Sequence, residues 1–439
     1  MTIRMDEGAA ELLDTLHRAG YAAYVVGGCV RDSLLGLTPH DWDLCTSALP
    51  QQVMELFGAQ RCIPTGLQHG TVTVKQSGAL YEITTFRTEG TYTDGRHPDE
   101  VHFVPDVRED LARRDLTINA MAYNEKEGLV DPFGGQADLQ SGIVRAVGVP
   151  RQRFTEDALR ILRLYRFAAR FGFAIDPPTA QAAQELCAHL DCVSVERIEE
   201  ELAKLLSAPA PAAYLNEKIL SVVLPELSPE ALAAAKPVVD ACPAGAENLP
   251  VRLAALLLSL GEDGIRRTLK RLRCSNALIE EAAVLVREAR GCDGSFLFGH
   301  DSGHSIASPI AFGNRVPPQR TVLRETTVTP GFTIYARRLL GRYNLCTVQR
   351  IAALGTALQP EHAADFAALS ELAEQLDADG VCCRVSQLAV NGRDLMAAGV
   401  PAGPGIRKVL EALLDGVIRE EYPNERQALL AAVQQLAAS

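Results

Sequence analysis

A pair of acidic residues beside a glycine turn carries the clearest chemistry in this sequence. Asp41 and Asp43 flank a tryptophan, and the segment GGCVRD at 27–32 precedes them. On a strand, acids at i and i+2 point to the same face, so both carboxylates could hold the same divalent cations. The turn at Gly28 would let backbone N–H groups approach a phosphate, and Arg31 could neutralise it. Together these residues predict the transfer of a nucleotidyl group.

The metal expected here is magnesium, which takes oxygen ligands and often bridges carboxylates to substrate phosphates. Two Mg²⁺ ions at Asp41 and Asp43 would activate an attacking hydroxyl and neutralise a pyrophosphate leaving group. A third carboxylate is expected to orient that hydroxyl, and Glu82, in the strand-like run YEITT, is the candidate. The alternative makes the pair turn or capping acids and Glu82 a surface residue. The adjacent glycine turn favours catalysis.

The elements that must position these residues change in character along the chain. The first 145 residues alternate short β-like runs with helical stretches and glycine turns, which predicts a mixed α/β head. After Thr155 an alanine- and leucine-rich periodicity predicts an almost entirely helical remainder. The fold class expected is α+β, and the predicted strands are 23–26, 41–45, 71–74, 81–85, 101–104 and 143–147.

The length and charge of the sequence limit the classes of protein to which it can belong. A chain of 439 residues is too long for one ordinary core, so several domains are expected. The sequence has no apolar run of membrane-spanning length and no leader pattern, which predicts a soluble, cytoplasmic protein without a membrane partner. A net charge of −12 argues against nonspecific nucleic-acid binding, but arginines cluster between 145 and 170 and between 266 and 273. Such patches could meet a phosphate backbone.

One segment, 291–335, does not fit a helical domain. It is rich in Gly, Ser, Pro and Thr, and an irregular stretch of this length inside a compact domain is improbable. We interpret it as an irregular insert or a sequence anomaly and expect it to be poorly ordered. Its His300, Asp301 and His304 could suggest a metal phosphohydrolase, but no further histidine or acid cluster nearby supports that alternative.

A charged helix is predicted over residues 156–170. At about 100° per residue, one half of the wheel carries the acids and arginines, namely Glu156, Asp157, Arg160, Arg163, Arg166 and Arg170. Such a helix buries its other side and offers this face to an anion, unless the face is a salt-bridged solvent surface. Asp157 and Arg160 could read a base edge together. The carboxylate would accept from an exocyclic amine and the guanidinium would donate to the ring nitrogen, which selects CTP and ATP over UTP and GTP.

Six segments between about 20 and 210 carry a family resemblance: GGCVRD, DWD, ITTFRTEGTYTDGRHPDEVHFV, ARRDLTINAMAYN, TEDALRILRLYRFAARFGF and VERIEEEL. In this order they resemble the class II tRNA nucleotidyltransferases, the bacterial CCA-adding enzymes. The segment from Asn391, NGRDLMAAGVPAGPGIRKVLEALLDGVIREEYPNER, resembles the tail of firmicute-type members. The resemblance implies a catalytic nucleotidyltransferase head (1–145), a nucleotide-selecting neck (146–210), a helical body (211–380) and a tRNA-binding tail (381–439), with the helical parts elongated.

The same resemblance implies roles for particular residues. Asp157 and Arg160 would read the base, with Arg163 and Arg166 as nearby nucleotide contacts. In Arg113-Arg114-Asp115, before a short helix beginning at Leu116, Arg114 would touch the nucleotide, and Asp115 would favour a ribose hydroxyl or cap the helix. The loop 88–98 would move during the switch from C to A addition, and the segment 195–202 would brace the base-reading helix.

The function expected is template-independent addition of C, C and A to the 3′ end of tRNA from CTP and ATP. The helical parts would hold the tRNA acceptor stem and elbow by shape and backbone contacts. Three alternatives stay open: a bacterial poly(A) polymerase, an A-adding enzyme that works beside a CC-adding partner, and a non-catalytic RNA-binding paralogue. The sequence does not decide between a monomer and a homodimer.

Overall fold

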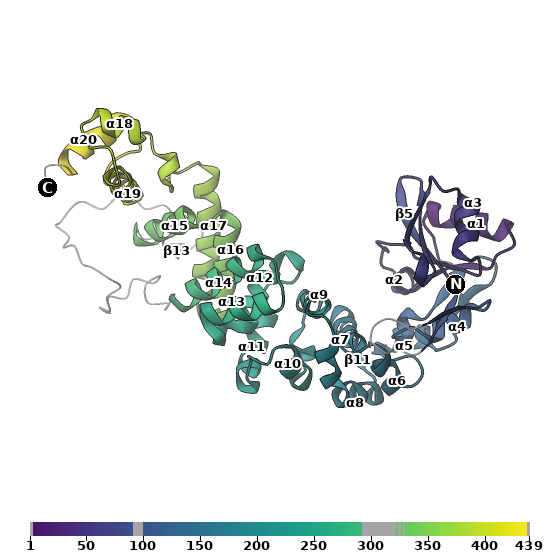
Figure 1. Cartoon of the computed structure of the whole chain (residues 1–439). Coiled ribbons are helices and arrows are strands. Elements are labelled where there is room, and N and C mark those ends of the chain that lie inside the picture. The colour runs from purple at the N-terminus through teal and green to yellow at the C-terminus, as the bar shows by residue number, and fades with distance from the viewer. Residues whose placement is uncertain (1–2, 91–99, 292–321, 324–325, 328–329, 437–439) are drawn as a thin grey trace. The chain divides into compact units, whose positions relative to one another are not determined.

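The computed structural model describes residues 3–90, 100–291, 322–323, 326–327 and 330–436, and Figure 1 shows their secondary structure. The chain forms two compact units. The first comprises Met1–Lys236, Ala244–Ala246 and Thr268–Cys274, and the second comprises Pro237–Pro243, Glu247–Arg267 and Ser275–Ser439. The division therefore falls within helices α11 (Pro229–Ala241) and α13 (Gly261–Arg271).

The head is built on a seven-stranded sheet with the order β3-β4-β5-β2-β1-β8-β9. Its only parallel pair joins β2 to β5, and all other neighbours are antiparallel. Tyr24, Cys45 and Phe86 belong to the buried cluster of this domain. The strands are β1 (Ala23–Val26), β2 (Leu44–Thr46), β3 (Cys62–Gly66), β4 (Thr71–Gln76), β5 (Ala79–Thr85), β8 (Ala122–Asn124) and β9 (Gly128–Val130). A separate pair joins β6 (Arg87–Glu89) to β7 (Val101–Phe103).

Helices flank the head sheet. Helix α1 (Glu7–Arg18) buries Leu12, Leu13 and Leu16, which are spaced to share one face, and Asp6 caps its first turn by accepting from the Ala9 N–H. It contacts β1 and β2, whereas α3 (Pro50–Phe57) contacts β4 and β5. The remaining head helices are α2 (Gly28–Leu34), α4 (Val107–Ala112) and α5 (Gly135–Ser141).

The predicted strands are largely confirmed, with one consequential error. The run 41–45 is wrong at its start, because β2 begins only at Leu44. The acids at 41 and 43 lie before the strand, outside the apolar interior in which Leu44 and Cys45 are buried. Asp43 nevertheless accepts a hydrogen bond through its carbonyl from the Val26 N–H at 2.9 Å. The run 143–147 is also shorter than predicted, since β10 comprises Ile143–Val144 and pairs with β11 (Ala174–Ile175).

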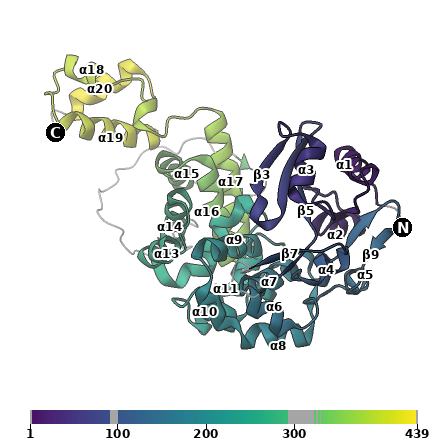
Figure 2. The ribbon, with the colours of Figure 1, turned by 45° about the vertical axis from the view of Figure 1, so that its right-hand side comes forward.

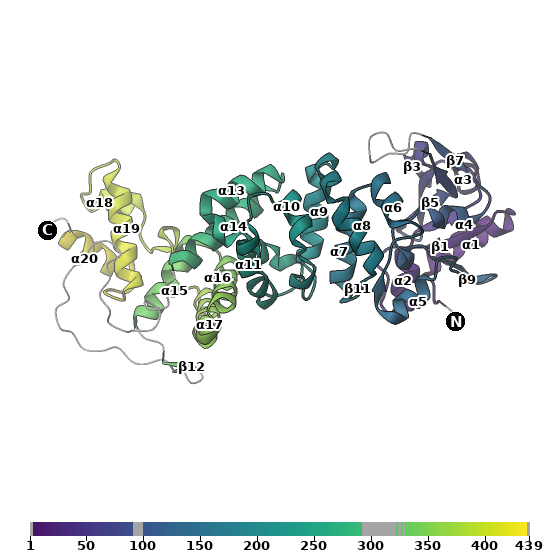
Figure 3. The same ribbon diagram turned by 90° about the horizontal axis from the view of Figure 1, so that it is seen from below.

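The neck helices pack side by side within the first unit (Figure 3). They are α6 (Pro150–Glu156), α7 (Leu159–Phe171), α8 (Pro177–Glu185) and α9 (Val195–Leu206). The single helix predicted over 156–170 is wrong, because the chain is extended at Asp157, with φ −144° and ψ 106°. The Asp157 carboxylate accepts from the Leu159 N–H at 3.0 Å, a local hydrogen bond that competes with helix continuation. Arg160 and Arg166 are buried, Arg163 is partly exposed and Arg170 is exposed, so only part of the charged side of α7 is packed against protein.

The rest of the described chain is mainly helical, as predicted. Beyond α10 (Glu217–Val223), the second unit contains α12 (Leu249–Leu257), α14 (Asn276–Gly291), α15 (Pro330–Arg342), α16 (Leu345–Leu358), α17 (Ala363–Ala378), α18 (Gly392–Ala397), α19 (Gly405–Ile418) and α20 (Arg426–Leu436). Helices α18–α20 surround a small core of their own that includes Leu395, Leu413 and Leu429 (Figure 2). None of the described helices combines the length and apolar character needed to cross a bilayer.

The irregular segment predicted over 291–335 is wrong at both ends. Gly291 is the last residue of α14, and α15 already begins at Pro330, since proline is well accommodated in the first helical turn. Between them the structure describes only the short pair β12 (Val322–Leu323) and β13 (Thr326–Thr327). His300, Asp301 and His304 lie outside the described residues, as does most of the predicted loop 88–98, of which Thr88 and Glu89 belong to β6.

Candidate nucleotidyl-transfer site

Three carboxylates gather where β2 and β5 lie side by side. The parallel register pairs Leu44 with Ile83, which brings Glu82 to the level of Asp43. Although solvent reaches the Asp43 side chain, desolvation by the surrounding protein raises its pKa. The negative charges of Glu82 and Asp41 raise this pKa further, whereas the positive charge of Arg114 lowers it. Mutual repulsion of carboxylates is what a bound cation would relieve. Within the described ranges, however, no three His, Cys, Asp or Glu side chains are arranged to hold a metal ion.

The glycine turn lies against one of the predicted nucleotide contacts. Gly27 has φ +79°, a backbone conformation that favours glycine, and a Cβ there would lie 2.9 Å from the Arg114 Nη1, so that Arg114 would have to shift. Gly28 follows as the first residue of α2. Arg114 is itself held by Asp110, whose Oδ2 lies 3.4 Å from its Nη2. The structure thus brings the turn, Arg114 and Asp43 close together.

Asp110 was missed by the sequence argument. It is fully buried and also binds Arg113, with an Nη2–Oδ1 distance of 2.9 Å. Burial alone would raise its pKa, but Arg113 and Arg114 hold that pKa below its ordinary value. The signal that could have identified Asp110 is its spacing of three and four residues from the two arginines, which places all three on one side of a helical turn.

Arg31 lies deeper than the sequence suggested. Its guanidinium is buried, pairs with Asp32 at 2.7 Å and donates to the side-chain oxygen of Asn119. Asp32 also accepts from the Arg170 Nη2 at 3.1 Å. Arg31 therefore links the glycine turn of the head to the end of α7. Its contact with a phosphate stays a prediction.

The predicted base readers are both paired with protein groups. Asp157 accepts from the Arg197 Nη2 at 2.8 Å, and Arg197 belongs to α9. Arg160 donates to Glu156 at 2.6 Å and to the Arg113 carbonyl at 3.1 Å. Because Asp157 precedes α7 and Arg160 follows in its first turn, the two side chains come from a helix junction. The bracing role predicted for 195–202 agrees with the Arg197 contact.

Arg163 and Arg166 share a buried carboxylate network. Arg166 donates to Glu201 of α9, while Arg163 donates to Asp115 with its Nε 2.7 Å from Oδ2. Asp115 is 7 % exposed and also accepts from the Leu116 N–H at 2.8 Å. Asp115 is therefore a buried partner of Arg163, and it also binds the backbone just before the short helical turn Thr117–Asn119.

Replacing Asp115 by asparagine should destabilise the protein in a pH-dependent way. Burial alone would raise the Asp115 pKa, but Arg163 lowers it to well below its ordinary value. A carboxylate whose pKa is depressed in the folded state stabilises that state fully above its unfolded-state pKa of ~3.9. This stabilisation is lost as pH falls toward the folded-state pKa. We expect Asp115→Asn to cost about 2 kcal/mol of unfolding free energy at pH 7. Denaturant unfolding at several pH values measures this, and a cost that stays constant down to pH 3 would contradict the assignment.

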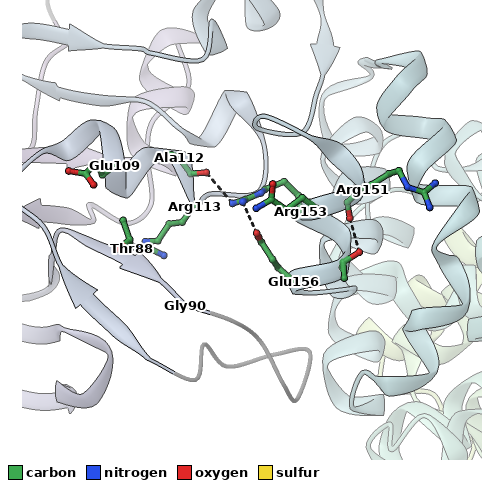
Figure 4. A pocket seen from close by; sticks show the side chains of 10 residues that line it. Thr88, Gly90, Glu109, Ala112, Arg113, Arg151, Arg153 and Glu156 are labelled. Carbon is green, nitrogen blue, oxygen red and sulfur yellow. Dashed lines mark hydrogen bonds and ion pairs between the residues drawn. The ribbon is translucent and has the colours of Figure 1, made fainter.

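A cavity of about 710 Å³ lies between the end of the head and the start of the neck (Figure 4). The end of α4, strand β6 and helix α6 line it with Thr88, Arg113, Arg153 and Glu156 among others. Arg153 donates to the Ala112 carbonyl at 3.1 Å and to Glu156 at 2.6 Å, which ties α6 to α4 across the cavity floor. Head and neck residues therefore border one cavity.

Comparisons with family models agree with this arrangement. The model described as the poly A polymerase head domain matches residues 23–145, and one for an RNA and SrmB-binding site of polymerase A matches 172–230. A third, for domain 2 of tRNA nucleotidyltransferases, matches 333–433. Fold and site together define a nucleotidyltransferase with a poly(A) polymerase type of head.

Relatives over nearly the full length specify the family further. The CCA-adding enzyme of Lactiplantibacillus plantarum is 35% identical over 97% of this chain and 95% of its own. That of Limosilactobacillus fermentum is 37% identical, over 98% and 97%. The chain belongs to the CCA-adding enzyme family.

Solved structures lead to the same family. The Bacillus stearothermophilus CCA-adding enzyme in complex with CTP superimposes with a TM-score of 0.78 at 30% identity, covering 99% of this chain and 98% of that one. The Thermotoga maritima CCA-adding enzyme complexed with tRNA shares the fold, with a TM-score of 0.67 at 21% identity, covering 99% and 97%.

Proposed function

We propose that this protein adds C, C and A to the 3′ end of tRNA, using CTP and ATP without a nucleic-acid template. The observation that carries the proposal is the grouping of Asp41, Asp43 and Glu82 beside the glycine turn and Arg114. It occurs in a chain that is similar along almost its whole length to CCA-adding enzymes.

In the proposed reaction, the tRNA 3′ hydroxyl attacks the α-phosphate of the nucleotide and pyrophosphate leaves. Glu82 orients that hydroxyl. Gly28 and Arg31 border the phosphates, and Arg114 balances the negative charge that develops near Asp43. Asp41 and Asp43 are oxygen donors of the kind that magnesium prefers. Bound Mg²⁺ would supply activation of the hydroxyl and neutralisation of the leaving group.

Nucleotide choice is assigned to the junction between α6 and α7. Asp157 and Arg160 offer an acceptor and a donor three residues apart, the pair that matches the amine and ring nitrogen of cytosine or adenine. To read a base, Asp157 must share or release Arg197, and Arg160 must do the same with Glu156. Arg163 and Arg166 are the neighbouring nucleotide contacts in this proposal.

The helical parts are assigned to tRNA. We keep the division into head (1–145), neck (146–210), body (211–380) and tail (381–439), with the body and tail holding the acceptor stem and elbow. The cytoplasm, where tRNA is available, is the proposed location. Whether a second copy of the chain takes part is measured by light scattering, with and without tRNA.

One assay tests the function directly. Purified protein is incubated with Mg²⁺ and tRNA that ends at the discriminator base, at CC or at CCA, with each labelled nucleotide singly and in pairs. We expect three-nucleotide extension that stops at CCA. Long A tails would instead indicate a poly(A) polymerase, and addition of A only to tRNA-CC would indicate a split pathway. No addition to any substrate would overturn the proposal.

A further inference from the structure

One aromatic ring in α7 lies against three of the arginines assigned to the nucleotide. The guanidinium carbons of Arg166, Arg31 and Arg163 lie 3.8, 4.9 and 5.5 Å from the centre of the Phe167 ring. The ring is 5 % exposed. At these distances a guanidinium is attracted by the negative face of the ring, and the attraction strengthens when water is excluded. Phe167 therefore contacts all three cations at once.

The three arginines come from two different parts of the first unit. Arg31 lies on α2 of the head, immediately after the glycine turn, whereas Arg163 and Arg166 lie on α7 of the neck. Phe171 adds a second ring, stacked 6.2 Å from Phe167, and Arg31 lies 5.1 Å from its centre. The aromatic pair is thus a shared surface on which a head arginine meets the neck arginines.

The charges of this network favour an anion. Four guanidinium groups, those of Arg31, Arg163, Arg166 and Arg170, are joined to only three carboxylates, Asp32, Asp115 and Glu201. Like charges this close repel one another, and Arg31 and Arg166 are also buried from the water that would screen them. A neutral ring with negative faces can hold such groups together without cancelling their charge, whereas a fourth carboxylate would cancel it. The four cations therefore exceed these three carboxylates by one charge.

We propose that Phe167 is a positioning residue that gathers Arg31, Arg163 and Arg166 for the triphosphate of the incoming nucleotide. The inference rests on the proposed function, because it takes these arginines as nucleotide contacts. It predicts that the ring acts on CTP and ATP equally, since both carry the same triphosphate. It also predicts no effect on base choice, which depends on Asp157 and Arg160.

The test compares steady-state kinetics of Phe167→Leu with those of the parent protein. We expect KM for CTP on tRNA lacking CCA, and for ATP on tRNA-CC, to rise together by roughly ten-fold, as the loss of partly buried cation–π contacts implies. The turnover number should change much less. Inhibition by cytidine, which has no phosphates, should be unaltered. Phe167→Tyr keeps the π face and should restore both KM values.

Matched variants separate this role from packing. Phe173 lies in the same aromatic cluster, 5.5 Å from Phe171, and among the described residues no guanidinium lies over its ring. Phe173→Leu should therefore leave both KM values unchanged. If Phe167→Leu lowers the melting temperature strongly, Phe167→Met offers an unbranched, flexible side chain that fills irregular core space, and it should show the same KM rise in a folded protein.

The outcomes distinguish the two proposals. If the parent protein fails to extend tRNA, the proposed function falls. If it extends tRNA but folded Phe167→Leu and Phe167→Met keep the parent KM values, only the positioning role is overturned. A rise for one nucleotide alone, or weaker cytidine inhibition, would also overturn it, because the ring would then act through the base.

Discussion

Asparagine in place of Asp43 should abolish nucleotide addition while leaving the protein folded. The side chain keeps its size, but one anionic oxygen ligand is lost beside Asp41 and Glu82. Stabilisation of several kcal/mol by the metal site corresponds to a loss in turnover of roughly 10³-fold or more. Single-turnover extension of tRNA with labelled CTP measures the effect, and circular dichroism checks the fold. The loss should be equal for C and A addition, because the same carboxylates serve both.

A matched carboxylate outside the site provides the control. Asp14 on α1 is solvent-exposed, and its ion-pair partner among the described residues is the equally exposed Arg18, at 3.3 Å. Asp14→Asn should leave turnover unchanged, since exposed pairs contribute little.

Raising the magnesium concentration should recover part of the activity if Asp43→Asn weakens metal binding. Turnover above a tenth of the parent value would rule out Asp43 as a ligand that the reaction requires.

Removal of the Arg160 side chain should change which nucleotides are accepted. Arg160→Ala takes away the donor that would face the ring nitrogen and leaves Asp157 with Arg197. A good paired contact discriminates between bases by about 1–3 kcal/mol, so the preference for CTP over UTP and for ATP over GTP should fall by roughly 5- to 150-fold. Competition assays with paired nucleotides give the ratio directly, as relative kcat/KM.

The interpretation of this variant depends on separating base choice from damage to the neck. Arg160 also ties Glu156 to the Arg113 carbonyl, so its removal could loosen the junction. Lys204→Ala removes an exposed cation of the same neck, one that pairs with Glu200, and should alter neither ratio. If Arg160→Ala lowers the rates for all four nucleotides equally, the residue supports the junction and does not read the base.

The order of elements was largely predictable because it depends on local pattern. Short alternating runs identified β1, β4 and β5, and alanine- and leucine-rich periodicity identified the helical remainder. The sequence missed β3, whose run contains Pro64 and pairs through an irregular register, and β8 and β9, which are only three residues long. Strands this short are set by their neighbours in the sheet more than by their own residues.

Both errors in the site concern where an element begins or ends. The doublet was expected on a strand and the arginines on one continuous helix, but β2 begins after Asp43, and Asp157 interrupts the path from α6 to α7. The Asp157 carboxylate accepts from the Leu159 N–H, and such local bonds make Asp a frequent boundary residue. A helical wheel assumes that no such boundary exists, so it predicted one open charged face, whereas Arg160 and Arg166 are buried in the structure.

The sequence by itself determined the chemical groups: the carboxylates at 41, 43 and 82, the glycine turn, and a series of arginines at helical spacing. These follow from residue type and short-range spacing, which the chain carries locally. Only the tertiary structure decided what those groups touch. It placed Glu82 beside Asp43 through strand pairing, paired Asp157 with Arg197, and gathered Arg31 with Arg163 and Arg166 around Phe167. Burial and ion pairing join residues far apart in the chain, and no local pattern encodes them.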